Sequence, residues 1–224
     1  MLMRIESRIL PLICASMLSI FLVCSADAST TKVESPVWAT PLNVNQGLPN
    51  LNRINSVLYR SAQPTKEGFE FLSHQPRLYP SDQPIKTVVS LRAFHEDRAV
   101  MPNQSPLRLE QIRFKTWHPE HEDIIKFLRI ATTPALQPIL VHCQHGSDRT
   151  GTMIAIYRIV VEGWTKEQAK EEMVHGNFGF HPIWQNLLHF IDDLDVDALR
   201  VELKKEGAWT ANSPKQWNDN NSEP

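Results

Sequence analysis

The sequence predicts an α/β fold of three layers, in which a central mixed or parallel sheet is flanked by helices. In the middle of the chain, short β-branched runs such as residues 85–92 alternate with amphipathic stretches such as residues 124–131, and a run of helices follows. Alternating strands and helices are typical of a sheet that is covered on both faces. At 224 residues and 42% hydrophobic, the chain is long enough for one domain with a sizeable core.

Residues 1–28 have the pattern of an export signal. Arg4 and Arg8 precede an apolar run over residues 9–23, and small residues follow at 24–28. The apolar run is shorter than the about 20 residues that a membrane-spanning helix needs. We therefore expect an exported protein, periplasmic or secreted, with no membrane span after the signal is removed; an uncleaved anchor is the alternative.

Cleavage after Ala26 or Ala28 would remove Cys14 and Cys24 and leave a single cysteine in the mature chain. An exported chain with one thiol has no internal disulfide, which favours a reactive role for that thiol. Acylation of Cys24, as in a lipoprotein, is a further alternative, but Val23 is bulkier than the small residue that such a site usually has.

Three segments follow the signal. Residues 29–52 are rich in Pro, Asn, Ser and Thr and predict an extended arm, residues 53–200 are expected to form the domain, and residues 201–224 are expected to be a polar, flexible tail. The formal net charge of −2 gives no electrostatic basis for binding nucleic acid or an anionic membrane.

The elements of the domain follow from hydrophobic periodicity and from turn and capping residues. The expected strands cover residues 53–60, 85–92, 112–116 and 139–142, and the expected helices cover residues 65–72, 124–131, 150–161, 165–175 and 182–194. In the last helix we expect one face to lie in the core, made of Ile183, Leu187, Phe190, Ile191 and Leu194.

One loop carries the strongest functional signal. A polar loop begins at Cys143, directly after the strand at 139–142, and a helix opens at Thr150. Such a loop directs backbone N–H groups inward, and the helix adds its own unpaired N–H groups and the positive end of its dipole. Arg149 can grip phosphoryl oxygens in pairs, and Gly146 lets the backbone approach closely. The pattern predicts an anion cradle with a thiol at its base.

This cradle favours nucleophilic catalysis at phosphorus. The loop amides, the helix dipole and Arg149 all stabilise negative charge, so we expect the Cys143 thiol to react as the thiolate. Its attack would give a phosphocysteine, which water then hydrolyses. Thr150 could donate its hydroxyl to the sulfur and make it a better leaving group, and it could also cap the helix.

The loop resembles the signature of the cysteine-dependent protein tyrosine phosphatases: His-Cys, five residues, Arg, Thr or Ser, Gly. The matching residues are His142, Cys143, Arg149, Thr150 and Gly151. The resemblance covers residues 58–194 and comes nearest to exported bacterial enzymes of the TpbA type. It implies a compact dual-specificity phosphatase fold and a phosphorylated protein or peptide substrate, with phosphotyrosine first and phosphoserine or phosphothreonine second. The phosphate-binding residues that it implies are Gln144, His145, Gly146, Ser147, Asp148 and Arg149.

Outside the loop, the segment at residues 59–64 and the strand end at Arg92 are candidates for substrate contact. The segment Tyr-Arg-Ser-Ala-Gln-Pro, residues 59–64, resembles the entry segment of compact bacterial and fungal dual-specificity phosphatases. On physical grounds alone, Tyr59 is expected to be a core aromatic residue and Arg60 a surface or packing residue. Arg92 ends the strand at 85–92, where it could meet phosphate or form an ion pair within residues 95–98.

The general acid is the open position in this sequence. Related enzymes carry an Asp on a loop before the cysteine, but no Asp lies between Arg98 and Glu122 here. Glu120 and Asp123 stand where the family usually keeps its acid, although both could simply cap a helix. Asp148, inside the loop, resembles the Asp of the Asp-Arg-Thr sequence in myotubularin-type and Sac-type phosphatases, or it is a structural carboxylate.

No metal and no redox cofactor is expected, because the His and acidic residues at 118–123 lack the His-Glu-x-x-His arrangement and have no partner cluster. Two other functions compete with the main interpretation. A phosphatase of inositol phosphates or phosphoinositides is less favoured, because the loop between Cys143 and Arg149 lacks the lysines that lipid-directed relatives often carry. A non-catalytic phosphopeptide-binding module is less favoured, because the cysteine, the arginine and Thr150 are all present.

Overall fold

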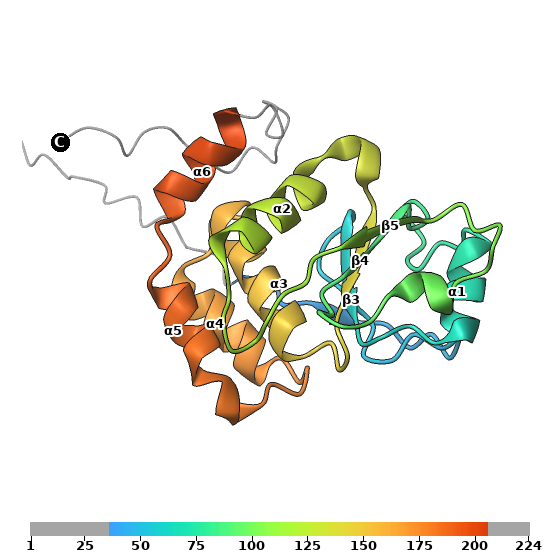
Figure 1. The fold of residues 1–224 in the computed structure, drawn as a ribbon, viewed down its shortest axis with the longest axis horizontal. Coiled ribbons are helices and arrows are strands. Elements are labelled where there is room, and N and C mark those ends of the chain that lie inside the picture. The colour runs from blue at the N-terminus through green and yellow to red at the C-terminus, as the bar shows by residue number, and fades with distance from the viewer. Residues whose placement is uncertain (1–35, 206–224) are drawn as a thin grey trace, which may run out of the picture. The chain divides into compact units, whose positions relative to one another are not determined.

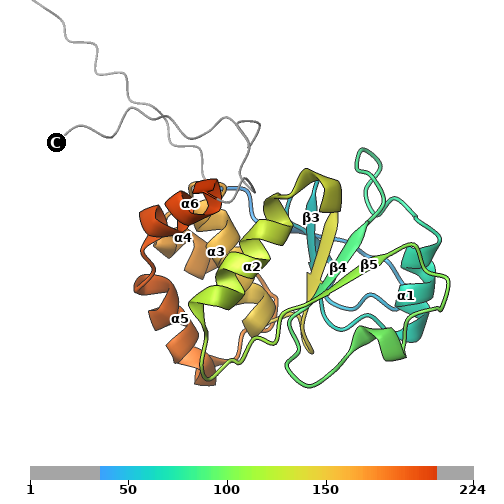
Figure 2. The same cartoon turned by 45° about the horizontal axis from the view of Figure 1, so that its top comes forward.

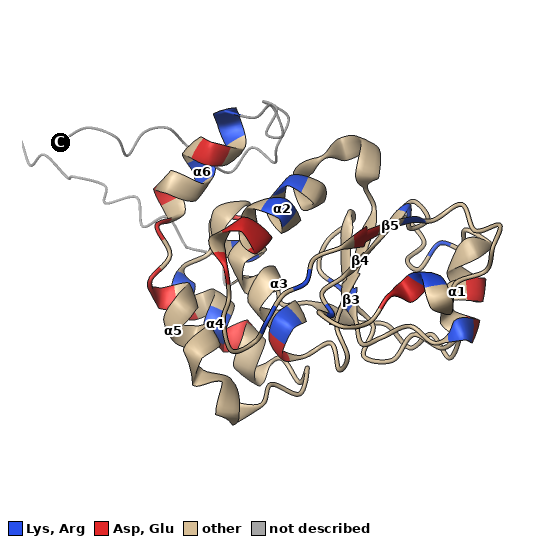
Figure 3. Cartoon of the chain, viewed as in Figure 1, with Lys and Arg blue, Asp and Glu red and all other residues tan. Residues whose placement is uncertain are grey.

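The computed structural model describes residues 36–205 and has the expected three layers (Figure 1). The export signal predicted at 1–28 and most of the predicted tail, residues 206–224, lie outside the described residues. Between residues 36 and 205 no helix is long and apolar enough to cross a membrane. Charged side chains of both signs are interspersed along α1, α2 and α6, in keeping with the small net charge (Figure 3).

A six-stranded sheet forms the middle layer, with the strand order β1-β2-β3-β6-β4-β5. Its strands are β1 (Thr40–Pro41), β2 (Asn52–Arg53), β3 (Leu58–Ser61), β4 (Thr87–Ser90), β5 (Arg108–Gln111) and β6 (Ile139–His142). The last four are parallel to their neighbours, whereas β1 and β2 add an antiparallel edge. The mixed sheet is as predicted, and all parallel strands end at one edge, where ligands of such sheets bind.

The helices are distributed unequally over the two faces of the sheet. They are α1 (Lys66–Ser73), α2 (His121–Thr132), α3 (Asp148–Val160), α4 (Lys166–His175), α5 (Gln185–Asp192) and α6 (Val196–Lys205), with short 3-10 turns at Asp97–Ala99, Pro134–Leu136 and Pro182–Trp184. Helix α1 covers one face, and α2 to α6 lie on the other side of the sheet (Figures 1 and 2).

Helix α3 is the centre of the larger helical layer. Every residue of α3 except Arg149 is buried. A helix that is buried all round needs no single apolar stripe, because the sheet and the other helices cover all of its sides. The start of α3, and with it the end of the nucleophile loop, is therefore fixed by packing on every side.

Two expected elements are wrong in position. The strand expected at 112–116 forms earlier, at Arg108–Gln111, because the register with β4 pairs Arg108 with Thr87 and Gln111 with Ser90. Ile112 and Phe114 are buried, but they pack into the core after the chain has left the sheet. The strand expected at 53–60 is divided between β2 and β3, because the chain turns at residues 54–57.

Three boundaries also need correction. Residues 201–205 were expected to belong to the tail but are the last residues of α6, which continues to Lys205 with Leu203 fully buried. Ile183 was expected in the core but is 79% exposed, because Pro182–Trp184 form a 3-10 turn and the helical phase begins only at Gln185. The helix expected to open at Thr150 already begins at Asp148.

Candidate active site

The nucleophile loop joins β6 to α3 at the carboxyl edge of the parallel strands. Cys143 follows the buried strand β6 directly and is 2% exposed, so the thiol lies at the bottom of the loop. Helix α3 begins behind the loop, and its first N–H groups and positive dipole end favour an anion here. The loop therefore has the anion-cradle placement that the sequence predicted.

Three consecutive carbonyl groups of the loop are bound from outside. The donors are Gln63 N–H to Gln144 O at 3.3 Å, Asn50 Nδ2 to His145 O at 3.0 Å, and Arg60 Nη2 to Gly146 O at 2.6 Å. In a planar trans peptide the C=O and the next N–H point in opposite directions. The N–H groups of His145, Gly146 and Ser147 are thereby turned toward the inside of the loop.

Gly146 has no room for a side chain. Its φ is +73°, and a Cβ atom would lie 2.6 Å from the backbone of Ser61 and Ala62 at the end of β3. Only glycine adopts this conformation and this approach without strain. The close contact presses the loop against β3, the strand that also supplies Arg60.

The arginines around Cys143 bind only neutral acceptors. Arg149 Nη1 donates to Leu91 O at 3.4 Å, Arg92 Nη1 to Gln63 Oε1 at 3.0 Å, and Arg60 to the Gly146 carbonyl. Burial and the neighbouring charge of Arg149 lower the pKa of Arg92, and the charges of Asp97 and Cys143 oppose them. Arg92 thus lies in the site, where it is close enough to both Asp97 and Cys143 to respond to their charges, while its hydrogen bond goes to Gln63.

Thr150 is available to the nucleophile. Its hydroxyl is buried and has no hydrogen-bond partner within residues 36–205. Its alternative role, capping the helix, does not apply, because the N-cap of α3 is Ser147 and Thr150 already lies inside the helix. A buried hydroxyl without a partner suits the expected hydrogen bond to the sulfur.

A buried hydrogen-bonded pair, Asp97 and His142, supports the loop from the strand side. His142 Nε2 lies 2.7 Å from Asp97 Oδ2, and Gln63 Nε2 donates to the other carboxylate oxygen at 2.9 Å. Burial opposes ionisation of Asp97, but the hydrogen bonds and charge of His142 outweigh it and lower the pKa of the carboxyl. The sequence analysis did not single out Asp97, because it is 45 residues away from His142 in the chain.

Asp148 is bound to a segment that precedes α5. One carboxylate oxygen accepts the His181 main-chain N–H at 2.8 Å, and the other lies 2.8 Å from His181 Nδ1. The ring of His181 is 5.5 Å from that of His145 in the loop. Ser147 Oγ donates to Phe178 O at 2.7 Å, so the same segment braces the loop twice.

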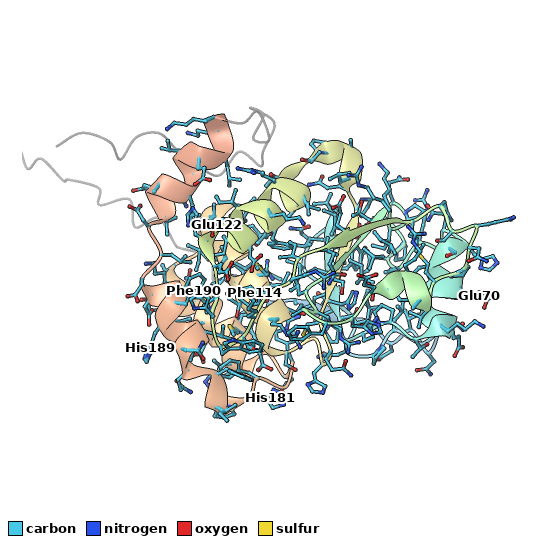
Figure 4. All side chains as sticks on the ribbon, in the orientation of Figure 1. Glu70, Phe114, Glu122, His181, His189 and Phe190 are labelled. Atoms are coloured by element: carbon cyan, nitrogen blue, oxygen red, sulfur yellow. The ribbon has the colours of Figure 1, made fainter. Side chains whose placement is uncertain are left out.

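Glu120 and Asp123 lie toward the opposite end of α3 from the loop. His121, the first residue of α2, lies 3.0 Å from Glu202 on α6. Arg200, also on α6, donates to the carbonyls of the last two residues of α3. Glu122 at the start of α2 and His181 are well separated (Figure 4). Of the expected acids, the structure therefore brings only Asp148 to the loop.

Glu120 and Asp123 differ in their local surroundings. Glu120 Oε1 is 3.1 Å from Lys115 Nζ, so that carboxylate is paired with a cation. Burial and the neighbouring Glu120 raise the pKa of Asp123, which is the direction that suits a proton donor, so the position of Asp123 away from the loop, and not its pKa, separates it from Asp148. Within residues 36–205 no group of three or more His, Cys, Asp or Glu side chains could hold a metal ion.

Attack of a buried sulfur on a phosphorus atom that loop amides and an arginine hold is the chemistry of the cysteine-dependent phosphatases, and fold and loop together define this class. A family model described as "DSP-PTPase phosphatase fused to NAD+ Kinase" matches residues 41–187. The chain belongs to this dual-specificity phosphatase family, and it is a cysteine-dependent protein phosphatase.

Relatives of known name agree with the family. The chain is 35% identical over 177 residues to the dual specificity protein phosphatase TpbA of Pseudomonas aeruginosa, a match over 79% of this chain and 75% of that protein. The crystal structure of TpbA covers 76% of this chain and 98% of its own, with a TM-score of 0.62. The inositol diphosphatase DSP5 of Arabidopsis thaliana is 29% identical, over 68% of this chain and 72% of its own length.

The hydrogen-bonded pair of Asp97 and His142 leads to a prediction about stability. Because the folded-state pKa of Asp97 is lowered, its contribution is present above the unfolded carboxyl pKa of about 3.9 and is lost as the pH falls through the folded value. Asp97→Asn should lower the free energy of unfolding by about 2 kcal/mol at pH 7. Urea unfolding of both proteins should show that the free energies of unfolding of wild type and Asp97→Asn differ less at pH 3 than at pH 7.

The matched control is Asp193→Asn, which changes an exposed carboxyl at the end of α5 and should alter stability by less than about 0.5 kcal/mol. If the free energies of unfolding of wild type and Asp97→Asn differ by the same amount at pH 7 and at pH 3, the charge of Asp97 does not stabilise the fold.

Proposed function

We propose that this protein is an exported phosphatase that hydrolyses phosphotyrosine in protein or peptide substrates through a phosphocysteine on Cys143. The observation that carries this proposal is the pair of arginines 92 and 149 near the thiol, which within residues 36–205 hydrogen-bond only neutral oxygens, with Arg60 behind the loop. Guanidinium groups without a hydrogen-bonded carboxylate are ready for a phosphoryl anion. A thiol that is 2% exposed also suits a phosphate at the end of a long, flat side chain.

The proposed reaction has two steps. The Cys143 sulfur attacks phosphorus, the P–S bond forms, and the bond to the tyrosine oxygen breaks while that oxygen takes a proton. Water then attacks phosphorus, the P–S bond breaks, and the sulfur leaves as a thiolate to which Thr150 donates a hydrogen bond. Throughout, Arg149 and the inward N–H groups hold the outer phosphoryl oxygens.

The proposed proton donor is His181, held by Asp148. The Asp148 carboxylate binds the main-chain N–H and Nδ1 of His181, which leaves Nε2 of a half-exposed ring to act toward solvent or substrate. An imidazole fixed at Nδ1 by a carboxylate is suited to general acid–base catalysis. His181 would replace the loop Asp that this chain lacks, and Asp148 would orient it.

A second candidate function is the hydrolysis of inositol phosphates. It is supported by the similarity to inositol diphosphatases and to the solved catalytic domain of the PP-IP phosphatase SIW14 of Saccharomyces cerevisiae, which is 25% identical with a TM-score of 0.58, over 73% of this chain and 96% of its own. Against it, none of the five residues between Cys143 and Arg149 is a lysine or an arginine. In contrast, a structure of TpbA with a cysteine-to-serine exchange is in complex with phosphotyrosine.

Export is proposed from the sequence at residues 1–28. Two arginines, an apolar run and small residues stand there in the order of a cleavable signal. The secreted or periplasmic form should begin at Asp27 or Ser29. Amino-terminal sequencing of the chain from a cell fraction tests this, and a chain found only in the cytoplasmic fraction with its first residues intact would refute export.

The substrate proposal predicts an order of turnover. A phosphotyrosine peptide should be hydrolysed faster than a phosphoserine peptide and inositol hexakisphosphate, when the three are compared side by side at equal concentration. Cys143→Ser should fold normally and lose turnover on all three, because a hydroxyl barely ionises where a thiolate is stable. If the inositol compound is turned over fastest, the second candidate function replaces the first.

The proton donor is tested by its dependence on the leaving group. His181→Asn and Asp148→Asn should lower phosphotyrosine turnover about 10²-fold, and turnover of nitrophenyl phosphate far less, because the nitrophenolate leaves without a proton. His189→Asn is the matched control, since His189 is exposed on α5, past the 3-10 turn that follows His181 (Figure 4).

Glu120→Gln and Asp123→Asn complete the comparison. Both variants should keep the turnover of both substrates close to that of the wild type. A selective loss on phosphotyrosine in either of these two variants, with His181→Asn unaffected, would return the acid to the start of α2.

A further inference from the structure

Arg60 is an unusual arginine for its position in the fold. It lies on β3, is 1% exposed, and is the largest side chain that is almost completely buried in the described part of the chain. Arginine is almost never fully buried unless it is paired. The other buried arginine with such exposure, Arg158, follows this rule, because its guanidinium binds Glu172 at 2.8 and 2.9 Å.

The contacts of Arg60 all lead to the nucleophile loop or to its brace. Nη2 donates to Gly146 O at 2.6 Å, and the guanidinium lies 3.7 Å from the centre of the Phe178 ring. Nε and Nη1 are buried and have no hydrogen-bond partner within residues 36–205. No carboxylate within that range forms an ion pair with Arg60. Phe178, on which the guanidinium stacks, is itself tied to the loop, because its main-chain carbonyl accepts the Ser147 hydroxyl.

Glu172 and Cys143 are the negative groups that act on the charge of Arg60. Burial lowers the pKa of Arg60 to about 10, while the charges of Glu172 and Cys143 raise it, so the group is protonated near neutral pH. Glu172 hydrogen-bonds Arg158 with both of its oxygens and not Arg60. Of the two groups, Cys143 belongs to the loop that Arg60 itself binds through Gly146 O.

We propose that Arg60 is a positioning residue of the phosphatase reaction, which fixes the peptide between Gly146 and Ser147 from outside and stabilises negative charge at Cys143 from beneath. Arg149 holds the phosphoryl oxygens, whereas Arg60 stays behind the loop and never touches the substrate. By holding the Gly146 carbonyl, Arg60 keeps the Ser147 N–H turned toward the phosphate. This role rests on the proposed phosphocysteine chemistry but not on the identity of the substrate.

The test measures the thiolate and the cradle without any turnover. Wild type, Arg60→Met and Arg60→Lys are alkylated with iodoacetamide as full chains, and modification of Cys143 is followed by mass spectrometry of its peptide. Without the charge, Arg60→Met should react about ten-fold more slowly than wild type at pH 6 and equally fast at pH 9, where the thiol ionises unaided. Arg60→Lys keeps the charge and should recover most of the rate at pH 6.

The second measurement is the concentration of inorganic phosphate that halves the alkylation rate. It should rise about ten-fold in Arg60→Met and several-fold in Arg60→Lys, because an ammonium cannot both bind Gly146 O and stack on Phe178 as a guanidinium fork does. Arg53→Met is the matched control: Arg53 also stacks on an aromatic ring, that of Tyr79, but it binds Asp82 and does not contact the loop.

Two results would overturn the proposal. One is a folded Arg60→Met chain whose alkylation at pH 6 and protection by phosphate both match those of Arg53→Met. The other result counts if Arg60→Met does not fold. If the phosphate concentration that halves the alkylation rate is then the same in Arg60→Lys as in wild type, the guanidinium does not position the loop. Because neither measurement uses a phosphorylated substrate, failure of the proposed substrate class would leave both readouts intact.

Discussion

The site depends on three positive charges that form no hydrogen bond to a carboxylate within the part of the chain that the structure describes. Arginines 60, 92 and 149 lie around Cys143 and bind only carbonyl or amide oxygens. The two buried carboxylates nearby, Asp97 and Asp148, are bound by histidines instead. Elsewhere in the fold the arrangement is the usual one, with Arg53 bound to Asp82 and Arg158 bound to Glu172. A buried charge without a hydrogen-bonded counter-ion is costly, so the exception at the buried Arg60 is meaningful where an anion must bind and react.

The rest of the fold keeps this unfavourable arrangement in place. Helix α3 is packed on every side, which fixes the amide groups at its start, and β6 is buried between two parallel neighbours. The loop between them is bound from outside through three successive carbonyl groups. Its amides therefore face the phosphate site before any ligand arrives, and binding does not have to supply the energy of ordering them.

The sequence predicted those parts of the site that are local in the chain. The order strand, loop and helix around Cys143, together with Arg149 and Thr150, follows from thirteen consecutive residues, 139–151, and the structure places them together. Tyr59 is buried as expected, and α4 begins with a capping box at Thr165, where the expected helix at residues 165–175 starts. Local rules succeed here because hydrophobic periodicity, caps and turn residues act within a few positions.

The supporting residues could not be predicted in this way. Asn50 and Arg60 reach the loop from positions 95 and 86 residues before their acceptors, and His181 reaches Asp148 from 33 residues after it. The residues next to Arg60 in the sequence do not reveal that its guanidinium lacks a carboxylate partner. That depends on which side chains pack around Arg60 in the folded interior. One feature of residues 59–64 could have indicated a role for Arg60. It is a charged residue in the middle of β3, and β3 pairs with β6, the strand that leads to Cys143.

The difference between the arginines and the carboxylates of the site bears on which group can donate the proton. A free carboxylate close to the loop would pair with one of the three arginines and neutralise the charge that the phosphate needs. Binding Asp148 and Asp97 to histidines removes them from this competition, and Glu120 is bound to Lys115 at a distance from the loop. The proposed histidine donor suits this site, because an imidazolium is left neutral after it gives up its proton, whereas a carboxylic acid is left as a carboxylate that can pair with the arginines.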